Sequence, residues 1–275
     1  MLLLFLSVPC QGRADNQFIS VQDGSASLAQ RIALLRSQSK NYPLLQNATL
    51  NKIAEGHCAD MVRRLYFSNV DPDGRDTRAR AMEAGYSLLP LEDHRVNGDN
   101  RLSSNLGLIT EGISGLVVNF PLPVSDAVDA IWSDLLRQEL SFIDSNLLEF
   151  GVSFGVAQFS LNGSQFYVYL VSVVIARPSI RNPYVFQCGH VVRRVMANNL
   201  FSPLEFVLQP VDSVPLLNAD DGSVLATTDT NGTYCFRAPR FSSIRYEVCD
   251  RSYLKIYPVD DTLLFTVDIQ SDCAK

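Results

Sequence analysis

The residues that could do chemistry in this chain are few, and its three histidines are His57, His94 and His190. Histidine is the side chain most often used for proton transfer or metal binding near neutral pH. His57 falls within a helical pattern, where we expect a lone histidine to pack or cap. His94 lies in the polar stretch 91–100, as expected for a solvated loop residue, and His190 belongs to the C-terminal part.

Two further groups could suggest a reactive or metal site. Asp71, Asp73 and Asp76 have spacing that resembles a calcium loop, but no glutamate follows at the position such a loop requires. Asp71-Pro72-Asp73-Gly74 is better explained as a turn. Cys58 lies on an apolar helical stripe, which favours a core residue over a thiol nucleophile. The sequence contains no Gly-x-Ser-x-Gly elbow, phosphate loop or dinucleotide fingerprint.

The elements that must position these residues change period along the chain. From Leu28 to about Leu136 the apolar spacing is helical. One stripe comprises Leu50, Ile53, Ala54, Cys58, Met61, Val62 and Leu65. We expect Thr49 or Asn51 to cap that helix, a second helix over 75–84 to end at Gly85, and Ser125 to cap a third over 126–136.

After that the period becomes two. Residues 149–159 and 165–176 are rich in Val, Phe and Tyr, and Asn162-Gly163 between them is a strong hairpin signal. From 182 to 275 the chain consists of short strands and turns, with candidate strands at 204–208, 223–228, 233–237, 253–257 and 263–269. This order predicts an α+β fold class, with a helix-covered sheet followed by a small β-sandwich.

Cysteine usage and the N-terminus both favour export. Cys188, Cys235, Cys249 and Cys273 all fall in the last third, which predicts two disulfides with three possible connectivities. Residues 1–8 are apolar, and we expect a signal peptide over 1–14, although no Lys or Arg precedes the run. Two alternatives stay open, a lipoprotein acylated at Cys10 and a frayed apolar terminus. The expected location is secreted, periplasmic or on the cell surface.

Composition excludes several classes of protein. The chain is 47% hydrophobic and 19% charged, as in folded globular proteins. Its formal net charge of -6, without a basic cluster, makes nucleic acid an unexpected partner. The longest apolar runs, 166–176 and 113–124, are too short to span a bilayer, so we expect no transmembrane segment.

The stretch 57–86 resembles the bacterial branch of the CAP (SCP-like) superfamily, which includes the cysteine-rich secretory, antigen 5 and pathogenesis-related 1 proteins. The resemblance rests on a helix with Met61, then Tyr66-Phe-Ser-Asn69, Asp71-Pro-Asp-Gly74, Arg80 and Gly85-Tyr86. Looser similarities follow at Thr110-Glu-Gly-Ile113, at the Trp132 helix and at 146–152. The resemblance covers residues 25–178 and implies a CAP-type α-β-α sandwich there.

The same resemblance implies where a divalent metal would lie in a cleft. The two histidine positions of the family are occupied by Asn69 and Gln138, the glutamate survives as Glu111, and a second glutamate position is Leu135. Neutral amides are poor zinc ligands compared with imidazole. We therefore expect a degenerate site with no metal, no cofactor and no catalytic residue. His94 and the segment 88–108 could cover this cleft as a lid.

Residues 214–236 resemble the hairpin of prealbumin-like or Cna-B-like sandwich modules, which implies a spacer or adhesion role for a domain over 184–275. Three hypotheses follow for the whole chain. The leading one is a non-catalytic module that binds an unknown small ligand or an extracellular or surface protein. The alternative is a hydrolase with Glu111 as general base, perhaps assisted by His94. The third is a structural component of a surface or matrix.

Overall fold

The computed structural model describes residues 17–39, 41–86, 109–138, 147–161, 163–178, 184–196, 206–240, 242–256, 264–270 and 273. The chain forms two compact units. The first comprises Met1–Ile32, Gln46–Phe142 and Glu149–Pro178, and the second Ala33–Leu45, Ile143–Leu148 and Ser179–Lys275. The expected signal peptide over 1–14 and the expected lid over 88–108, with His94, lie outside the described residues.

The first unit is built on an antiparallel sheet with the strand order β1-β4-β5-β3, and β2 also pairs with β4. The strands are β1 (Ile19–Ser20), β2 (Leu45–Gln46), β3 (Ile109–Val118), β4 (Glu149–Leu161) and β5 (Ser164–Ala176). The predicted β4–β5 hairpin is confirmed, and Gly163 has a φ of 80° at its turn. The prediction of helical structure from Leu28 to about Leu136 is wrong at Ile109–Val118, which forms the strand β3.

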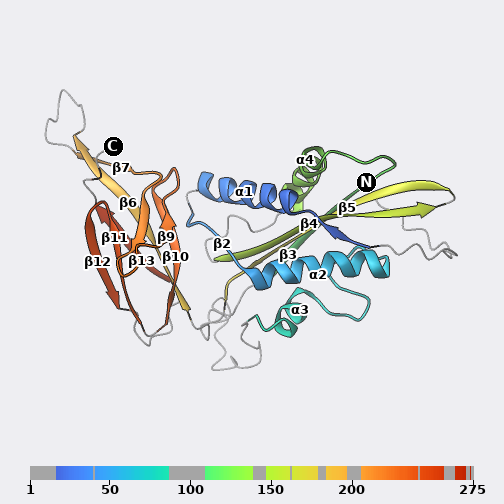
Figure 1. Ribbon diagram of the computed structural model, residues 1–275, viewed down its shortest axis with the longest axis horizontal. Coiled ribbons are helices and arrows are strands. Elements are labelled where there is room, and N and C mark those ends of the chain that lie inside the picture. Colours follow the sequence, from blue (N-terminus) through green and yellow to red (C-terminus); the bar gives the residue numbers. More distant parts are fainter. Residues whose placement is uncertain are drawn as a thin grey trace, which may run out of the picture. The chain divides into compact units, whose positions relative to one another are not determined.

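Helices cover both faces of this sheet, as Figure 1 shows. They are α1 (Gln22–Gln38), α2 (Ala48–Arg64), α3 (Thr77–Glu83) and α4 (Val124–Leu135), the last followed by a 3-10 turn at Leu136–Gln138. On β4, Gly151 faces the backbone of α2, whereas Phe154 on the opposite face packs against Gly24 of α1. On β3, Ile113 packs against the α2 face and the neighbouring Ser114 bonds to Asp134 of α4. The predicted α-β-α arrangement is therefore present.

The helix caps differ in detail from the expectations. Asn47 caps α2, with its side-chain oxygen accepting from the backbone N–H groups of Thr49 and Leu50. Asn51, one of the two expected caps, instead accepts a hydrogen bond from the backbone N–H of Val152 on β4. The α4 cap is Pro123 without a side-chain bond, so Ser125 is not the cap.

The second unit is a disulfide-linked β structure of two four-stranded sheets. One sheet has the order β10-β6-β13 with β7 beside β6, and the other has the order β12-β11-β8-β9. The strands are β6 (Tyr184–Met196), β7 (Phe206–Pro210), β8 (Pro215–Asn218), β9 (Val224–Thr227), β10 (Thr233–Pro239), β11 (Ser243–Val248), β12 (Arg251–Ile256) and β13 (Leu264–Gln270). One buried cluster joins the two sheets, with Phe236 of β10 and Tyr246 of β11 in edge contact.

The predicted cysteines form two disulfides, Cys188–Cys235 and Cys249–Cys273. Cys188 and Cys235 are register partners on the neighbouring strands β6 and β10, so sheet pairing brings them together. This arrangement selects one of the three connectivities that the sequence left open.

None of the helices in the described part of the chain is long and apolar enough to cross a membrane.

Gly151 tests how closely α2 must approach the sheet. A Cβ at this position would overlap the backbone of Leu50 and Asn51. We expect Gly151→Ala to lower the free energy of unfolding by about 1–3 kcal/mol through overpacking. Urea denaturation measures this, with Gly56→Ala in α2 as the matched control, because a Cβ at Gly56 meets nothing within 4 Å. That control should stabilise by about 0.5–1 kcal/mol, and equal effects of the two substitutions would contradict the close contact.

Candidate functional site

Glu111 on β3 carries a buried carboxylate in the first unit. Its side chain is 1% exposed. One oxygen, Oε1, accepts from His57 Nδ1 and Ser172 Oγ, each at 2.6 Å. The other, Oε2, accepts from Thr77 Oγ1 at 2.6 Å and from Arg80 Nη2 at 2.5 Å. Four donors therefore occupy both carboxylate oxygens.

The donors reach Glu111 from three other elements. His57 comes from α2, Thr77 and Arg80 come from α3, and Ser172 comes from β5. Ser172 is the register partner of Ile113, two residues after Glu111, so it shares the sheet face of Glu111. Arg80 also donates through Nη1 to the carbonyl of Arg75, at 2.8 Å, which ties α3 to the turn before it.

Electrostatics keep Glu111 ionised. Burial alone raises the pKa of its carboxyl, but the hydrogen bond and charge of His57, with Arg80 and Ser172, outweigh burial and lower the pKa below its ordinary value. The other ring nitrogen of His57, Nε2, lies 3.1 Å from the carbonyl oxygen of Ser68. Both ring nitrogens of His57 thus have an oxygen within hydrogen-bond distance, and Nδ1 also lies 3.3 Å from Arg80 Nη2.

Asn69 and Gln138, at the family's histidine positions, bond to the backbone of β3. Asn69 Nδ2 donates to the carbonyl of Glu111 at 3.3 Å, and Gln138 Nε2 donates to the carbonyl of Ile113 at 2.8 Å. β3 is the last strand in the sheet order, so these two carbonyls lie on its outer edge. The two amides therefore supply hydrogen-bond donors to backbone carbonyl groups of an edge strand. Sequence reasoning did not foresee this role.

These residues do not fit the divalent metal that the family resemblance implies. Both oxygens of the Glu111 carboxylate accept hydrogen bonds. The side-chain amides of Asn69 and Gln138 donate their N–H groups to backbone carbonyls. Leu135, at the second glutamate position, is buried and apolar. Across the described ranges, no group of three or more His, Cys, Asp or Glu side chains could hold a metal ion.

The remaining candidates have structural partners. Burial raises the pKa of the Cys58 thiol, with further contributions from Glu111 and Glu55, so this free cysteine is not a ready nucleophile. His190 lies in the second unit, with Nδ1 2.9 Å from Asp268. Sequence reasoning missed His57 as a partner of Glu111, and it named Arg80 only as part of the motif that carries the family resemblance.

The aspartates of the turn at 71–74, and Asp76 after it, hold the local backbone in place. Asp71 accepts from the backbone N–H groups of Asp73 and Arg75 and from Arg75 Nε. Burial opposes its ionisation, but these hydrogen bonds outweigh it and lower the Asp71 pKa to about 2. Asp76 caps α3 through the backbone N–H of Ala79. The turn interpretation of these aspartates matches these contacts.

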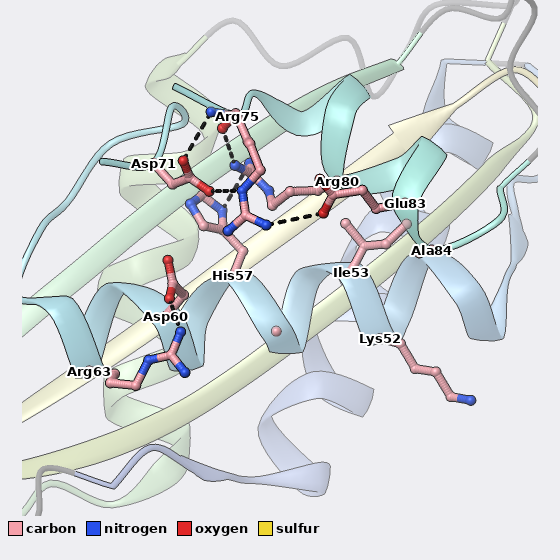
Figure 2. A pocket seen from close by; sticks show the side chains of 11 residues that line it. Lys52, Ile53, His57, Asp60, Arg63, Asp71, Arg75, Arg80, Glu83 and Ala84 are labelled. Atoms are coloured by element: carbon pink, nitrogen blue, oxygen red, sulfur yellow. Dashed lines mark hydrogen bonds and ion pairs between the residues drawn. The ribbon is translucent and has the colours of Figure 1, made fainter. Parts of the chain in front are cut away.

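A pocket of about 350 Å³ opens beside the buried cluster, between α2 and the segment 71–84. His57 and Arg80 form part of its lining, whereas Asn69, Glu111 and Gln138 do not. Its charged side chains, most of them joined in ion pairs in Figure 2, are Lys52, Asp60, Arg63, Asp71, Arg75, Arg80 and Glu83. A second, smaller pocket of about 270 Å³ has a mainly neutral polar lining that includes Asn51 and Ser153.

Comparisons with known proteins find similarities to solved structures. No protein-family model matches the chain, and no curated protein matches it. An outer surface protein from Borrelia burgdorferi is similar with a TM-score of 0.40 and 14% identity, over 59% of this chain and 98% of that one. An extracellular protein containing an SCP domain from Bacillus anthracis is similar with a TM-score of 0.35 and 16% identity, over 55% of this chain and 40% of that one.

The lowered pKa of Glu111 predicts acid sensitivity. Because the folded-state pKa lies below the unfolded value of about 4.3, its ionised form stabilises the fold above that pH, and this contribution is lost as the pH falls through the folded pKa. We expect Glu111→Gln to destabilise by about 3–5 kcal/mol at pH 7, since it leaves the buried Arg80 without its counter-charge and disturbs the hydrogen bond to His57. The variant should also show a shallower loss of stability on acidification.

Urea denaturation at a series of pH values measures both effects. Glu83→Gln is the matched control, because Glu83 is 56% exposed and pairs with Arg75 at the surface. It should change stability little. A Glu111→Gln variant with wild-type stability at pH 7 and the same loss of stability at low pH as the wild type would contradict the role given to this carboxylate.

Proposed function

We propose that this chain is an exported, non-catalytic binding module, in which the residues at the family's metal-site positions maintain the fold. The observation that carries the proposal is the complete occupation of the Glu111 carboxylate by four donors. Binding is assigned to the pocket between α2 and segment 71–84, which is open to a small ligand.

The same geometry argues against the hydrolase alternative. A general base needs a free lone pair within reach of the proton it removes, and a pKa near the working pH. Glu111 is buried, its oxygens accept hydrogen bonds from His57, Ser172, Thr77 and Arg80, and its pKa is lowered. It is therefore a weak base without access to a substrate, and it acts as the counter-ion of Arg80 and as a hydrogen-bond partner of His57.

Export is supported by the two disulfides of the second unit. Disulfides persist in oxidising compartments and are rare where glutathione keeps thiols reduced. The apolar segment 1–8 supplies the expected export signal. A surface or secreted location also suits a module that binds a ligand or another extracellular protein.

Zinc titration by calorimetry tests the non-catalytic proposal. We expect no saturable zinc binding by the mature protein, because neither amide position offers an imidazole and Glu111 is already paired. Glu111→Ala and Glu111→Gln serve as controls, with circular dichroism to verify that each is folded.

Tight zinc binding that disappears in a folded Glu111 variant would overturn the proposal. So would hydrolysis of ester, peptide or glycoside substrates that depends on Glu111. Zinc binding that both Glu111 variants retain would place a metal elsewhere and would likewise contradict a metal-free module.

A further inference from the structure

Gly56 in the pocket wall has no evident packing role. It lies in the middle of α2, where glycine is costly compared with alanine. Glycines at such positions are usually explained by close contact, as at Gly151, but a Cβ on Gly56 would meet nothing within 4 Å. Because Gly56 has no side chain, this wall of the pocket is low and leaves space for a ligand. The helix stability lost by having glycine at this position is the cost of that space.

One cation around this space is left without a partner. The lining holds four cationic side chains and three carboxylates, each carboxylate is paired with an arginine, and Arg80 pairs with Glu111 outside the lining. Asp60 pairs with Arg63, and Arg75 bridges Asp71 and Glu83. Lys52 has no ion-pair partner among the described residues, and in Figure 2 it extends at the rim, away from the arginines. Its flexible four-carbon stem allows the ammonium group to turn over the opening.

Arg80 supplies a second sign of an absent partner. Its side chain is 10% exposed, and its Nη atoms are engaged by Glu111 and by backbone carbonyls. Its Nε is buried without a hydrogen-bond partner in the part of the chain that the structure describes. A buried guanidinium N–H without an acceptor is unfavourable, and an oxyanion is the acceptor that arginine binds best. An oxyanion in the pocket would reach Nε only after a small turn of the Arg80 side chain, which lines the pocket.

From the low wall at Gly56, the unpaired Lys52 and the unfilled donor of Arg80, we infer that this pocket binds a small oxyanion, a carboxylate or a phosphate group. The inference rests on the proposed binding function and names its ligand class. Neutral and cationic ligands gain nothing from Lys52, and an apolar ligand would meet a charged lining.

Calorimetric titration of the whole chain at low ionic strength, with inorganic phosphate and acetate as separate probes, tests the inference. We expect saturable binding of at least one probe, weakened by added sodium chloride. The tighter probe identifies the source of the oxyanion, phosphoryl or carboxyl. Ethylammonium is the charge-reversed probe, and preferential binding of ethylammonium would overturn the inference.

Two charge variants should act in opposite directions. Lys52→Gln removes the unpaired cation and should weaken binding by about two- to fivefold, the range of an exposed ion pair. Glu83→Gln releases Arg75 from a carboxylate that is 56% exposed and should strengthen binding by a similar factor. Arg137→Gln, on the 3-10 turn after α4 and outside the pocket lining, is the charge control and should change nothing.

Gly56 gives the test that separates binding from folding. Gly56→Met puts a good helix former into α2, so we expect its Tm to equal or exceed that of the wild type by about 2–4 °C. The same side chain fills the pocket and should weaken phosphate or acetate binding more than tenfold. Ala48→Met, at the exposed start of α2 and outside the lining, is the matched control and should bind as the wild type does.

The outcomes separate this inference from the function on which it rests. Absence of saturable binding for both anions, or binding unchanged in a folded Gly56→Met variant, would overturn the oxyanion site and leave the non-catalytic proposal standing. Zinc binding or Glu111-dependent hydrolysis would instead overturn the proposed function, whatever the anion titration gives.

Discussion

The buried carboxylate of Glu111 is the interaction on which the first unit depends. It joins β3 to α2 through His57, to α3 through Arg80 and Thr77, and to β5 through Ser172. A buried charge is tolerated only when its partners are complete, and removal of one partner leaves the others uncompensated. The helices on this face are therefore held to the sheet by a polar contact that specifies their position, in addition to the apolar packing of α2.

That same contact decides what the site can do. The carboxylate of Glu111 already holds four donors, which supports the proposed non-catalytic role, and the amides of Asn69 and Gln138 donate to the outer carbonyls of β3. An edge strand with satisfied carbonyls resists pairing with other chains. The residues at the positions where the resemblance implies a metal thus bond within the fold, and the proposed ligand pocket is lined by His57, Arg80 and Gly56.

The sequence predicted some elements well and missed others for identifiable reasons. The stripe from Leu50 to Val62 has a clear helical period, and it forms the buried face of α2. Asn162-Gly163 marked the hairpin because few residue pairs suit its turn. β3 was missed, because 111–114 is buried on both faces and such a strand lacks a period of two. β6 and β11 were likewise not foreseen as strands in the second unit.

Local preference therefore determined the helices, the β4–β5 hairpin, the acidic turn at Asp71 and the presence of four cysteines able to pair. Only the tertiary structure decided which cysteines pair, since register between β6 and β10 places Cys188 beside Cys235. It also decided the role of His57, which a helical pattern alone made a packing residue, by placing it against a carboxylate 54 residues away in the sequence. A side chain's neighbours along the chain follow from local spacing, whereas the charge it meets in the core depends on how separate elements pack.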